Sequence, residues 1–423
     1  MTSQDMSASW WARAERVIPL GTQTMSKHPS QWVGGGVHPT HIARGQGAHL
    51  FDVDGNEWID EPMALGPILL GYAEPVIDEA IREQLAKGIT FTLMHPLEVE
   101  VAERIVALCP GVDQVRFAKT GSDAVSAAIR AARAHTGRDL VLVGGYHGWH
   151  DWFIGSTTRD KGVPGTVSDL TVAFRYGDLD ELAELLARHR GQVAAVVLEP
   201  SGATLPPAGY LQGLVDLCRA DGVISVFDEV ITGFRLAPGG ARQRYGVQPD
   251  LSCYGKALGN GMPIAAVGGS RVLMAEFEEV FFSGTHGGEA LSLAAARAVL
   301  DTIADGTVLA AIEERGSRLQ AGVRDLVDRH GLSGLITVDG EPHRTIVGFG
   351  GPDPLITKSF VQQGQAEAGC LFNGSLFICA RHTDADVAQI LAGFEASFAV
   401  LADGVDVAAR LRGAPVEPVF RAP

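Results

Sequence analysis

Short apolar runs alternate with amphipathic stretches through the middle of the chain. The apolar runs predict buried strands at Val115–Ala118, Leu140–Val143, Ala194–Leu198 and Val223–Phe227. The amphipathic stretches, whose apolar residues recur every three or four positions, predict helices over 125–135, 179–190 and 211–220. Continuous apolar strands that alternate with helices are typical of a mostly parallel sheet covered on both faces, so the sequence predicts an α/β fold.

The last third of the chain has a different character. Its pattern predicts a long helix over 308–330, short strands over 345–349 and 376–379, and a closing helix over 384–401. We interpret this part as a smaller α+β domain. The expected organisation is an N-terminal segment (1–70) that joins the small domain, a large domain (71–305) and a C-terminal small domain (306–423).

Composition narrows the class of protein. The net charge of −16 disfavours nucleic acid as a partner and suits either a cationic substrate or simple solubility. The five cysteines are scattered without a CxxC pair, so we expect no zinc site, no disulfide frame and a reducing, cytoplasmic location. We also expect no membrane span, because no run reaches ~18 uncharged apolar residues, and no signal peptide, because the N-terminus has no basic region followed by an apolar one.

Two polar residues stand out near the ends of apolar strands. Asp228 follows the strand that ends at Phe227, and Lys256, one of only six lysines, lies in a glycine-bounded turn after the next apolar run. Asp228 alone would also suit a Mg²⁺ ion or a ribose, but the chain has neither a Walker loop nor a GxGxxG in a βαβ context. Together, the amine and the acid suit pyridoxal phosphate, whose aldehyde bonds a lysine and whose ring nitrogen is held protonated by an acid.

Further residues at strand ends suit the same cofactor. Gly121 and Ser122 lie in a turn that leads into a helix, where free N–H groups and the helix dipole attract a phosphate, although an ordinary N-cap has the same pattern. Tyr146 could stack on a flat ring, and Glu199 also falls at a strand end.

The loop around Tyr146 is rich in aromatic residues. His147 and His150 do not indicate a metal, because no cysteine or further histidine lies at ligand spacing. Trp149 and Trp152 are either core residues or walls of a substrate pocket.

These residues and their surroundings resemble the class III family of fold-type-I pyridoxal-phosphate enzymes over nearly the whole chain. The resemblance is closest to the branch that contains glutamate-1-semialdehyde aminomutase. It rests on the shared segments Phe51–Asp60, Leu65–Gly71, Ala131–Arg138, Asp228–Arg235 and Gly255–Pro263.

The resemblance implies a role for each candidate. Lys256 matches the Schiff-base lysine and Asp228 the partner of the ring nitrogen, with Val230 under the ring and Tyr146 above it. Gly121 and Ser122 match the phosphate turn. Thr285 matches a threonine that reaches the cofactor phosphate of the neighbouring subunit, which implies a homodimer with composite active sites.

Three positions depart from the aminomutase pattern. Ser30 stands where the aminomutase has an arginine that reads the substrate carboxylate, Thr204 stands in place of an asparagine near the cofactor hydroxyl, and His286 begins a segment that replaces Ser-Gly-Asn. The segment from His286 and the Tyr146 loop look more like relatives that aminate sugars and aminoglycoside-type antibiotics.

We therefore expect an aminotransferase that moves an amino group, by ping-pong chemistry through Lys256, from a donor such as glutamate to a sugar-like carbonyl. Trp149, Trp152 and Ser30 are the expected substrate residues. The alternatives are glutamate-1-semialdehyde aminomutase itself, an amino-sugar epimerase that uses the same cofactor, and a catalytically silent relative, which the intact Lys256 and Asp228 disfavour.

Overall fold

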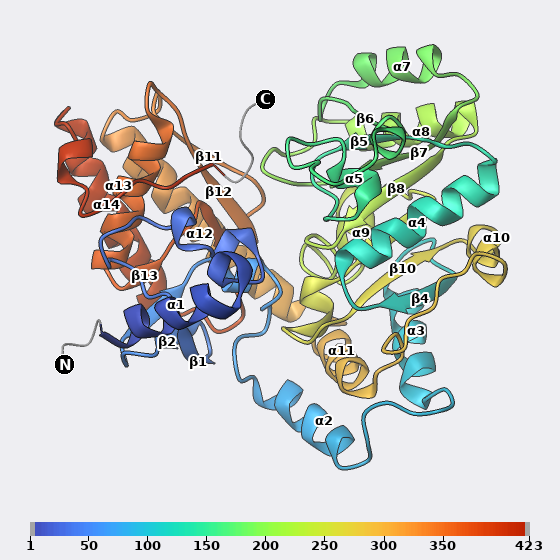
Figure 1. The fold of residues 1–423 in the computed structure, drawn as a ribbon, viewed down its shortest axis with the longest axis horizontal. Coiled ribbons are helices and arrows are strands. Elements are labelled where there is room, and N and C mark those ends of the chain that lie inside the picture. Colours follow the sequence, from blue (N-terminus) through green and yellow to red (C-terminus); the bar gives the residue numbers. More distant parts are fainter. Residues whose placement is uncertain (1–4, 419–423) are drawn as a thin grey trace. The chain divides into compact units, whose positions relative to one another are not determined.

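The structure is a computed structural model that describes residues 5–418, and these residues form two compact units (Figure 1). The larger unit contains residues 66–68 and 75–309. The smaller unit contains the described residues up to 65, residues 69–74 and the described residues from 310 onward. The chain thus passes between the units more than once, and the C-terminal crossing falls inside one helix, α12 (Thr307–Arg329).

A seven-stranded sheet forms the centre of the larger unit. Its order is β4-β10-β9-β8-β7-β5-β6, and only β10 runs antiparallel to its neighbours, so the predicted mostly parallel sheet is confirmed. Its strands are β4 (Gln114–Ala118), β5 (Leu140–Gly144), β6 (Thr171–Ala173), β7 (Val193–Leu198), β8 (Ile224–Glu229), β9 (Leu251–Tyr254) and β10 (Ala265–Gly269).

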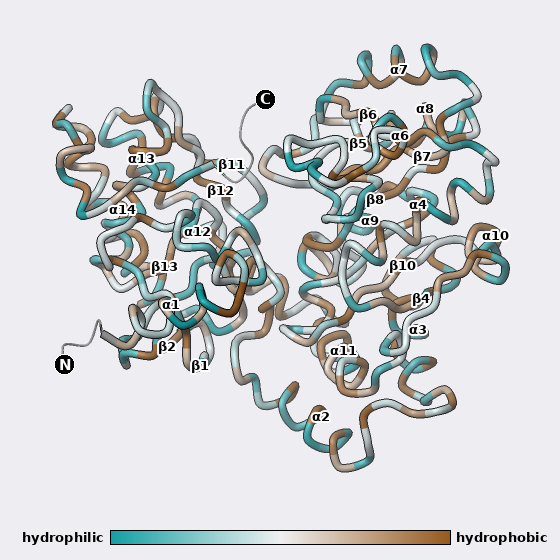
Figure 2. Tube along the Cα trace, in the orientation of Figure 1, coloured by the Kyte–Doolittle hydropathy of each residue, from teal (hydrophilic) through white to brown (hydrophobic). Residues whose placement is uncertain are grey.

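Helices cover both faces of this sheet. Alternate strand residues point to opposite faces, so Val141 and Val143 of β5 pack with α4, whereas Leu140 and Leu142 pack with α7 and α8. Figure 2 shows brown segments along the central strands and alternating teal and brown turns in α7. The helices of this unit are α2 (Pro75–Leu85), α3 (Pro96–Leu108), α4 (Gly121–Thr136), α5 (Asp151–Ile154), α6 (Gly165–Ser168), α7 (Leu179–Arg188), α8 (Tyr210–Asp221), α9 (Gly240–Tyr245), α10 (Arg271–Met274) and α11 (Ala290–Ile303).

Helix α4 begins earlier than the hydrophobic pattern predicts. The Thr120 hydroxyl accepts a hydrogen bond from the Asp123 N–H, and the Asp123 carboxylate accepts one from the Thr120 N–H. This capping box starts the helix at Gly121 instead of Val125. Gly121 and Ser122 are therefore the first residues of the helix and not part of a preceding loop.

The smaller unit contains two small sheets and four longer helices. Its helix α14 has the length and composition of a membrane span, but Val387, Ile390, Phe394 and Phe398 are buried, and core helices share that composition. The strands are β1 (Ile42–Gln46), β2 (His49–Asp52), β3 (Glu57–Asp60) and β13 (Cys370–Leu371) in one sheet, and β11 (Ile336–Asp339), β12 (Arg344–Phe349) and β14 (Ser375–Phe377) in the other. The helices are α1 (Asp5–Val17), most of α12, α13 (Pro354–Glu367) and α14 (Asp384–Ala402).

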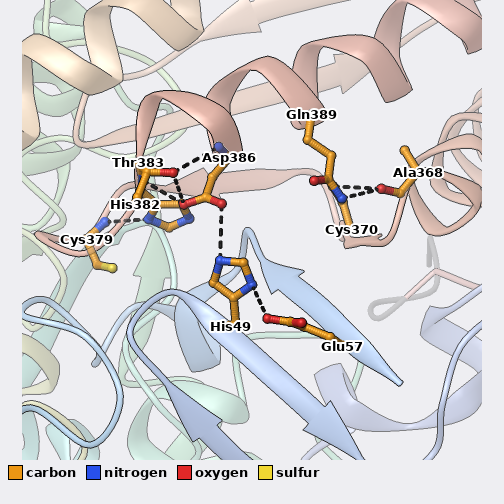
Figure 3. A network of polar contacts seen from close by, with 9 residues as sticks. All are labelled: His49, Glu57, Ala368, Cys370, Cys379, His382, Thr383, Asp386 and Gln389. Atoms are coloured by element: carbon orange, nitrogen blue, oxygen red, sulfur yellow. Dashed lines mark hydrogen bonds and ion pairs between the residues drawn. The ribbon is translucent and has the colours of Figure 1, made fainter. Parts of the chain in front are cut away.

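A polar network ties β2 to the start of α14 (Figure 3). His49 lies between two carboxylates, 3.1 Å from Asp386 and 3.0 Å from Glu57. Nearby, the Nδ1 atom of buried His382 accepts a hydrogen bond from the Cys379 N–H. Burial lowers the pKa of His382 to about 4, because an imidazolium is poorly solvated there.

We predict that His382 makes the protein less stable in mild acid. The pKa of His382 in the folded protein lies below its ordinary value of 6.5. The neutral side chain therefore contributes its full stabilisation of the fold above pH 6.5, and this contribution is lost as the pH falls toward about 4. Between pH 7 and 5 the loss should be roughly 2 kcal/mol. In urea denaturation, His382→Asn should lose this part of the pH dependence, whereas the partly exposed His189→Asn should keep it. Identical pH dependence in wild type and His382→Asn would contradict this assignment.

Candidate active site

Strand β8 places Asp228 on the face of the sheet that α4 covers. Ile224 and Val226 of the same strand pack in the cluster formed with α4, and the two-residue period puts Asp228 on their side. Asp228 is only 5% exposed. Its Oδ1 accepts a hydrogen bond from the Val230 N–H at 3.1 Å, and its Oδ2 lies 2.9 Å from Nδ1 of His147.

Lys256 begins a short turn (Lys256–Gly259) that follows β9 and Gly255. Its φ of +43° lies in the left-handed region, which a non-glycine residue adopts only at a cost of about 1–3 kcal/mol. Residues held this way are concentrated at functional sites. The side chain is partly buried.

Val230 brings three segments of the predicted site together. A Cβ atom on Gly121 would lie 2.8 Å from both methyl groups of Val230, and one on Gly255 would lie 3.4 Å from its Cγ1. The helix that starts at Gly121, the turn after Asp228 and the turn that holds Lys256 therefore meet at this side chain. The glycines allow the close approach, since a side chain at Gly121 would collide with Val230.

The first turn of α4 is suited to bind an anion. Among residues 5–418, the backbone N–H groups of Gly121 and Ser122 have no hydrogen-bond acceptor. Such N–H groups and the positive end of the helix dipole attract phosphate. The Ser122 Oγ accepts a weak hydrogen bond from the Trp149 N–H at 3.4 Å, so the aromatic loop closes over this turn.

Tyr146, in the loop after β5, and Glu199, directly after β7, also lie at the site. Tyr146 is half exposed, and its ring meets Phe153 edge-on at 5.5 Å. Burial and then the charge of Asp228 raise the pKa of Tyr146, which places the phenol in the electrostatic neighbourhood of Asp228. A Cβ atom on Gly145 would lie 3.6 Å from Oε1 of Glu199, so Glu199 faces the same loop.

The two tryptophans of this loop have opposite surroundings. Trp149 is 65% exposed, whereas Trp152 is 8% exposed, packs in the core and donates its indole N–H to Ser126 at 2.8 Å. The structure supports the core interpretation of Trp152 and not the expectation that it lines a substrate pocket.

No described contact joins the remaining predicted residues, Thr285 and Ser30, to this cluster. Thr285 is exposed and lines a cavity of about 1340 Å³, whose lining does not include Asp228 or Lys256. Ser30 belongs to the smaller unit, where its hydroxyl lies 2.9 Å from Nδ1 of His28.

The structure brings a further residue into this cluster, His147, which contacts Asp228. The sequence does not indicate a metal at His147, and the described residues contain no group of three metal-binding side chains. The sequence feature that could have pointed to His147 is its position directly after Tyr146, in the loop that follows β5. Strand β5 lies two positions from β8 in the sheet.

Comparison with known proteins identifies the family. The model of the family Aminotransferase class-III matches residues 33–341. The chain belongs to the class-III aminotransferases. It is 35% identical to a glutamate-1-semialdehyde 2,1-aminomutase of Desulforudis audaxviator, over 93% of this chain and 97% of that one.

Solved structures show the same fold. The FumI protein of Sphingopyxis sp. MTA144, in a form with pyridoxal phosphate (PLP), is 30% identical, with a TM-score of 0.88 over 96% of this chain and 99% of that one. An omega-transaminase from Sphaerobacter thermophilus is 28% identical, with a TM-score of 0.85 over 94% of this chain and 98% of that one. The fold-type-I architecture and PLP as the cofactor, both expected from the sequence, are confirmed.

The residues at the site fit this cofactor. Gly121 and Ser122 offer N–H donors for a phosphate, and Asp228 offers a carboxylate for the ring nitrogen. Lys256 offers the amine, and Tyr146 and Val230 offer surfaces for the two ring faces.

We predict that Gly148→Ala weakens PLP binding. At Gly148, φ is +101° and a Cβ atom would lie 2.3 Å from Ser122 Oγ, so the substitution must displace the phosphate turn. The dissociation constant for PLP, measured by titration, should rise tenfold or more. Gly137→Ala is the matched control, because its φ is also positive but nothing lies within 4 Å. It should cost about 1 kcal/mol of stability without changing the affinity. Equal PLP affinity in both variants would contradict the placement of the loop.

Proposed function

We propose that this protein transfers an amino group at PLP, with Lys256 and Asp228 as the catalytic residues. The observation that carries the proposal is the convergence of the Gly121 turn, Asp228 and the Lys256 turn on Val230. Bound PLP supplies an aldehyde that bonds amines and a ring that accepts electrons.

The protein residues supply position and proton transfer. Lys256 would hold the cofactor through its aldehyde, with loss of water, and a substrate amine would take its place. The freed Nζ would then be the base that moves a proton between the α-carbon of the substrate and C4′ of the cofactor. Asp228 keeps a proton on the ring nitrogen, which lets the ring withdraw electrons. The first turn of α4 and Ser122 hold the phosphate, which keeps the reacting atoms of the cofactor positioned near Lys256.

The relatives favour an aminomutase reaction over the sugar transamination that we expected from the sequence. The aminomutase that is similar over 93% of this chain is named for a 2,1 shift in glutamate-1-semialdehyde. We therefore propose this intramolecular transfer, from carbon 2 to carbon 1, as the first candidate reaction.

A second candidate is transfer between molecules, from a donor such as glutamate to a separate carbonyl compound, including a sugar. It is favoured by Ser30, where the resemblance places a carboxylate-reading arginine. The Ser30 hydroxyl bonds with His28 and cannot form the paired contacts that a guanidinium offers a carboxylate.

A substrate comparison tests both candidates. We predict that the purified holoenzyme converts glutamate-1-semialdehyde to its 1-amino isomer, as followed by chromatographic separation of the two isomers, which have the same mass, before mass detection. Parallel reactions contain glutamate with oxidised sugars, oxidised aminoglycosides or simple aldehydes, and Lys256→Ala is the control throughout. Conversion of glutamate to its keto acid, without turnover of the semialdehyde, would replace the first candidate by the second. No lysine-dependent turnover in any reaction would refute the proposed function.

We further propose that the active sites form in a homodimer, with Thr285 reaching the phosphate bound by the partner. Members of the family typically form dimers. Thr285 lines the cavity described above together with Met94 and Phe281, which are 82% and 81% exposed. Exposed apolar side chains of this size around a cavity mark a surface that binds another protein.

Mixing two inactive variants tests the composite site. Lys256→Ala and Thr285→Ala subunits should together form heterodimers with one intact site, which takes Lys256 from one chain and Thr285 from the other. We therefore predict that the mixture regains up to half of the wild-type activity per heterodimer, together with tight PLP binding. If subunit exchange is verified by mass and nothing is regained, Thr285 does not act across the dimer.

A further inference from the structure

Lys119 follows directly after β4 and forms an ion pair to which the proposed chemistry assigns no role. Its Nζ lies 3.1 Å from Oε2 of Glu289, the residue that precedes α11. The two side chains are only 22% and 12% exposed, so the pair is screened less than a pair on the open surface. Burial would raise the pKa of Glu289, but hydrogen bonds from Ser292 and Lys119 outweigh burial and lower that pKa, so the carboxylate is charged at neutral pH.

Helix α11 does not need Lys119 in order to begin. Oε1 of Glu289 accepts a hydrogen bond from the Leu291 N–H at 2.6 Å, and its Oε2 accepts bonds from the Ser292 N–H at 3.2 Å and the Ser292 hydroxyl at 2.6 Å. These bonds already cap the helix. The charge of Lys119 is therefore an additional restraint, which ties the end of β4 to the segment that leads into α11.

That segment is the loop that carries Thr285. The Gly287 N–H donates to the Gly284 carbonyl at 3.0 Å, which places Thr285 inside a tight turn. The Glu289 N–H then donates to the His286 carbonyl at 3.2 Å, so a second turn follows the first. The two turns leave little freedom between Thr285, which is exposed, and Glu289, which is buried. The ion pair thus holds the base of a loop whose tip lies at the surface.

We propose that Lys119 is a positioning residue that holds this loop so that Thr285 reaches the PLP phosphate bound by the partner subunit. Lys119 thereby serves the active site of the partner and not that of its own chain. Lys119 and Thr285 also line the same cavity of about 1340 Å³, on the surface proposed to bind the partner. The proposal rests on the composite site proposed above.

The place of Lys119 in the sequence, just ahead of Gly121, would instead suit a role in the phosphate turn of its own chain. The structure gives that turn a separate support, because the capping box of Thr120 and Asp123 fixes the start of α4. The described ion pair of Lys119 leads to Glu289 and not to this turn. The two roles make opposite predictions when subunits are mixed.

Single variants test whether the ion pair matters for the cofactor. Lys119→Met keeps the length of the side chain without its charge, and it should raise the Kd for PLP roughly tenfold, because a partly buried pair is lost. Lys119→Arg keeps the charge and should bind PLP nearly as the wild type does. Arg297→Met is the matched control, because Arg297 lies further along α11 and pairs with Glu100 of α3 at 2.9 Å. It should leave the Kd for PLP unchanged.

Mixed dimers decide in which subunit Lys119 acts. Lys119→Met subunits are mixed with Lys256→Ala or with Thr285→Ala subunits, and exchange is verified by mass. At a PLP concentration that fills wild-type sites but not weakened ones, borohydride fixes PLP to Lys256, and mass spectrometry identifies the labelled chain. This measurement needs no substrate. The mixture of Lys256→Ala with Thr285→Ala is the reference for the composite site.

We expect the Lys119→Met chain to be labelled as fully as the wild type when its partner is Lys256→Ala, because that partner supplies an intact loop. With Thr285→Ala as the partner, neither chain of the heterodimer should be labelled well. The reverse pattern would place Lys119 in its own site and overturn the proposal. An unchanged Kd in Lys119→Met, or an equal rise in Arg297→Met, would overturn it as well.

The reference mixture separates this proposal from the one on which it rests. If the Thr285→Ala chain gains no label beside Lys256→Ala, the composite site itself fails, and the role of Lys119 fails with it. If the reference chain is labelled while the Lys119→Met mixtures show the reverse pattern, the composite site stands and only the role of Lys119 is lost.

Discussion

Parallel pairing of β8 with β9 is the constraint on which the site depends. In this register Asp228 lies opposite Cys253 and Glu229 lies opposite Tyr254. Both strands therefore end at the same edge of the sheet, and Lys256 follows only two residues after Tyr254. The carboxyl ends of parallel strands are the usual place for ligands in such sheets. Side chains that are far apart in the sequence thereby reach one place without long loops.

The two residues at the end of β8, Asp228 and Glu229, point to opposite faces of the sheet. Asp228 points toward the proposed cofactor site, whereas Glu229 points into the protein and accepts hydrogen bonds from the Ala241 N–H and the Thr232 hydroxyl. Burial raises the pKa of Glu229 to about 7. A Cβ atom on Gly240 would lie 2.2 Å from its carboxylate, so the segment that leads into α9 is held closely against the strand. A buried network next to the site thus holds the strand end from which Asp228 projects.

Close packing around glycines keeps the chemical groups near one another. Gly121 and Gly255 leave room for Val230, and Gly148 leaves room for Ser122. Because protein interiors are densely packed, even one added methyl group at such a position moves the backbone. The precision of the proposed site therefore comes from small residues as much as from the polar ones.

The sequence by itself determined four of the seven strands of the larger unit (β4, β5, β7 and β8) and three of its helices (α4, α7 and α8), and it indicated Lys256 and Asp228. It did so because apolar periodicity and strand-end residues are local features. It placed the start of α4 four residues too late, since a capping box and not hydrophobic spacing starts that helix. It did not predict that β10 lies antiparallel between β4 and β9, because strand order depends on pairing between distant segments.

Only the tertiary structure decided the roles of the aromatic loop. Trp149 and Trp152 are three residues apart, yet packing buries one and exposes the other. His147 meets an aspartate 81 residues away, and no local pattern encodes that contact, because it arises where two strands of one sheet end on the same side.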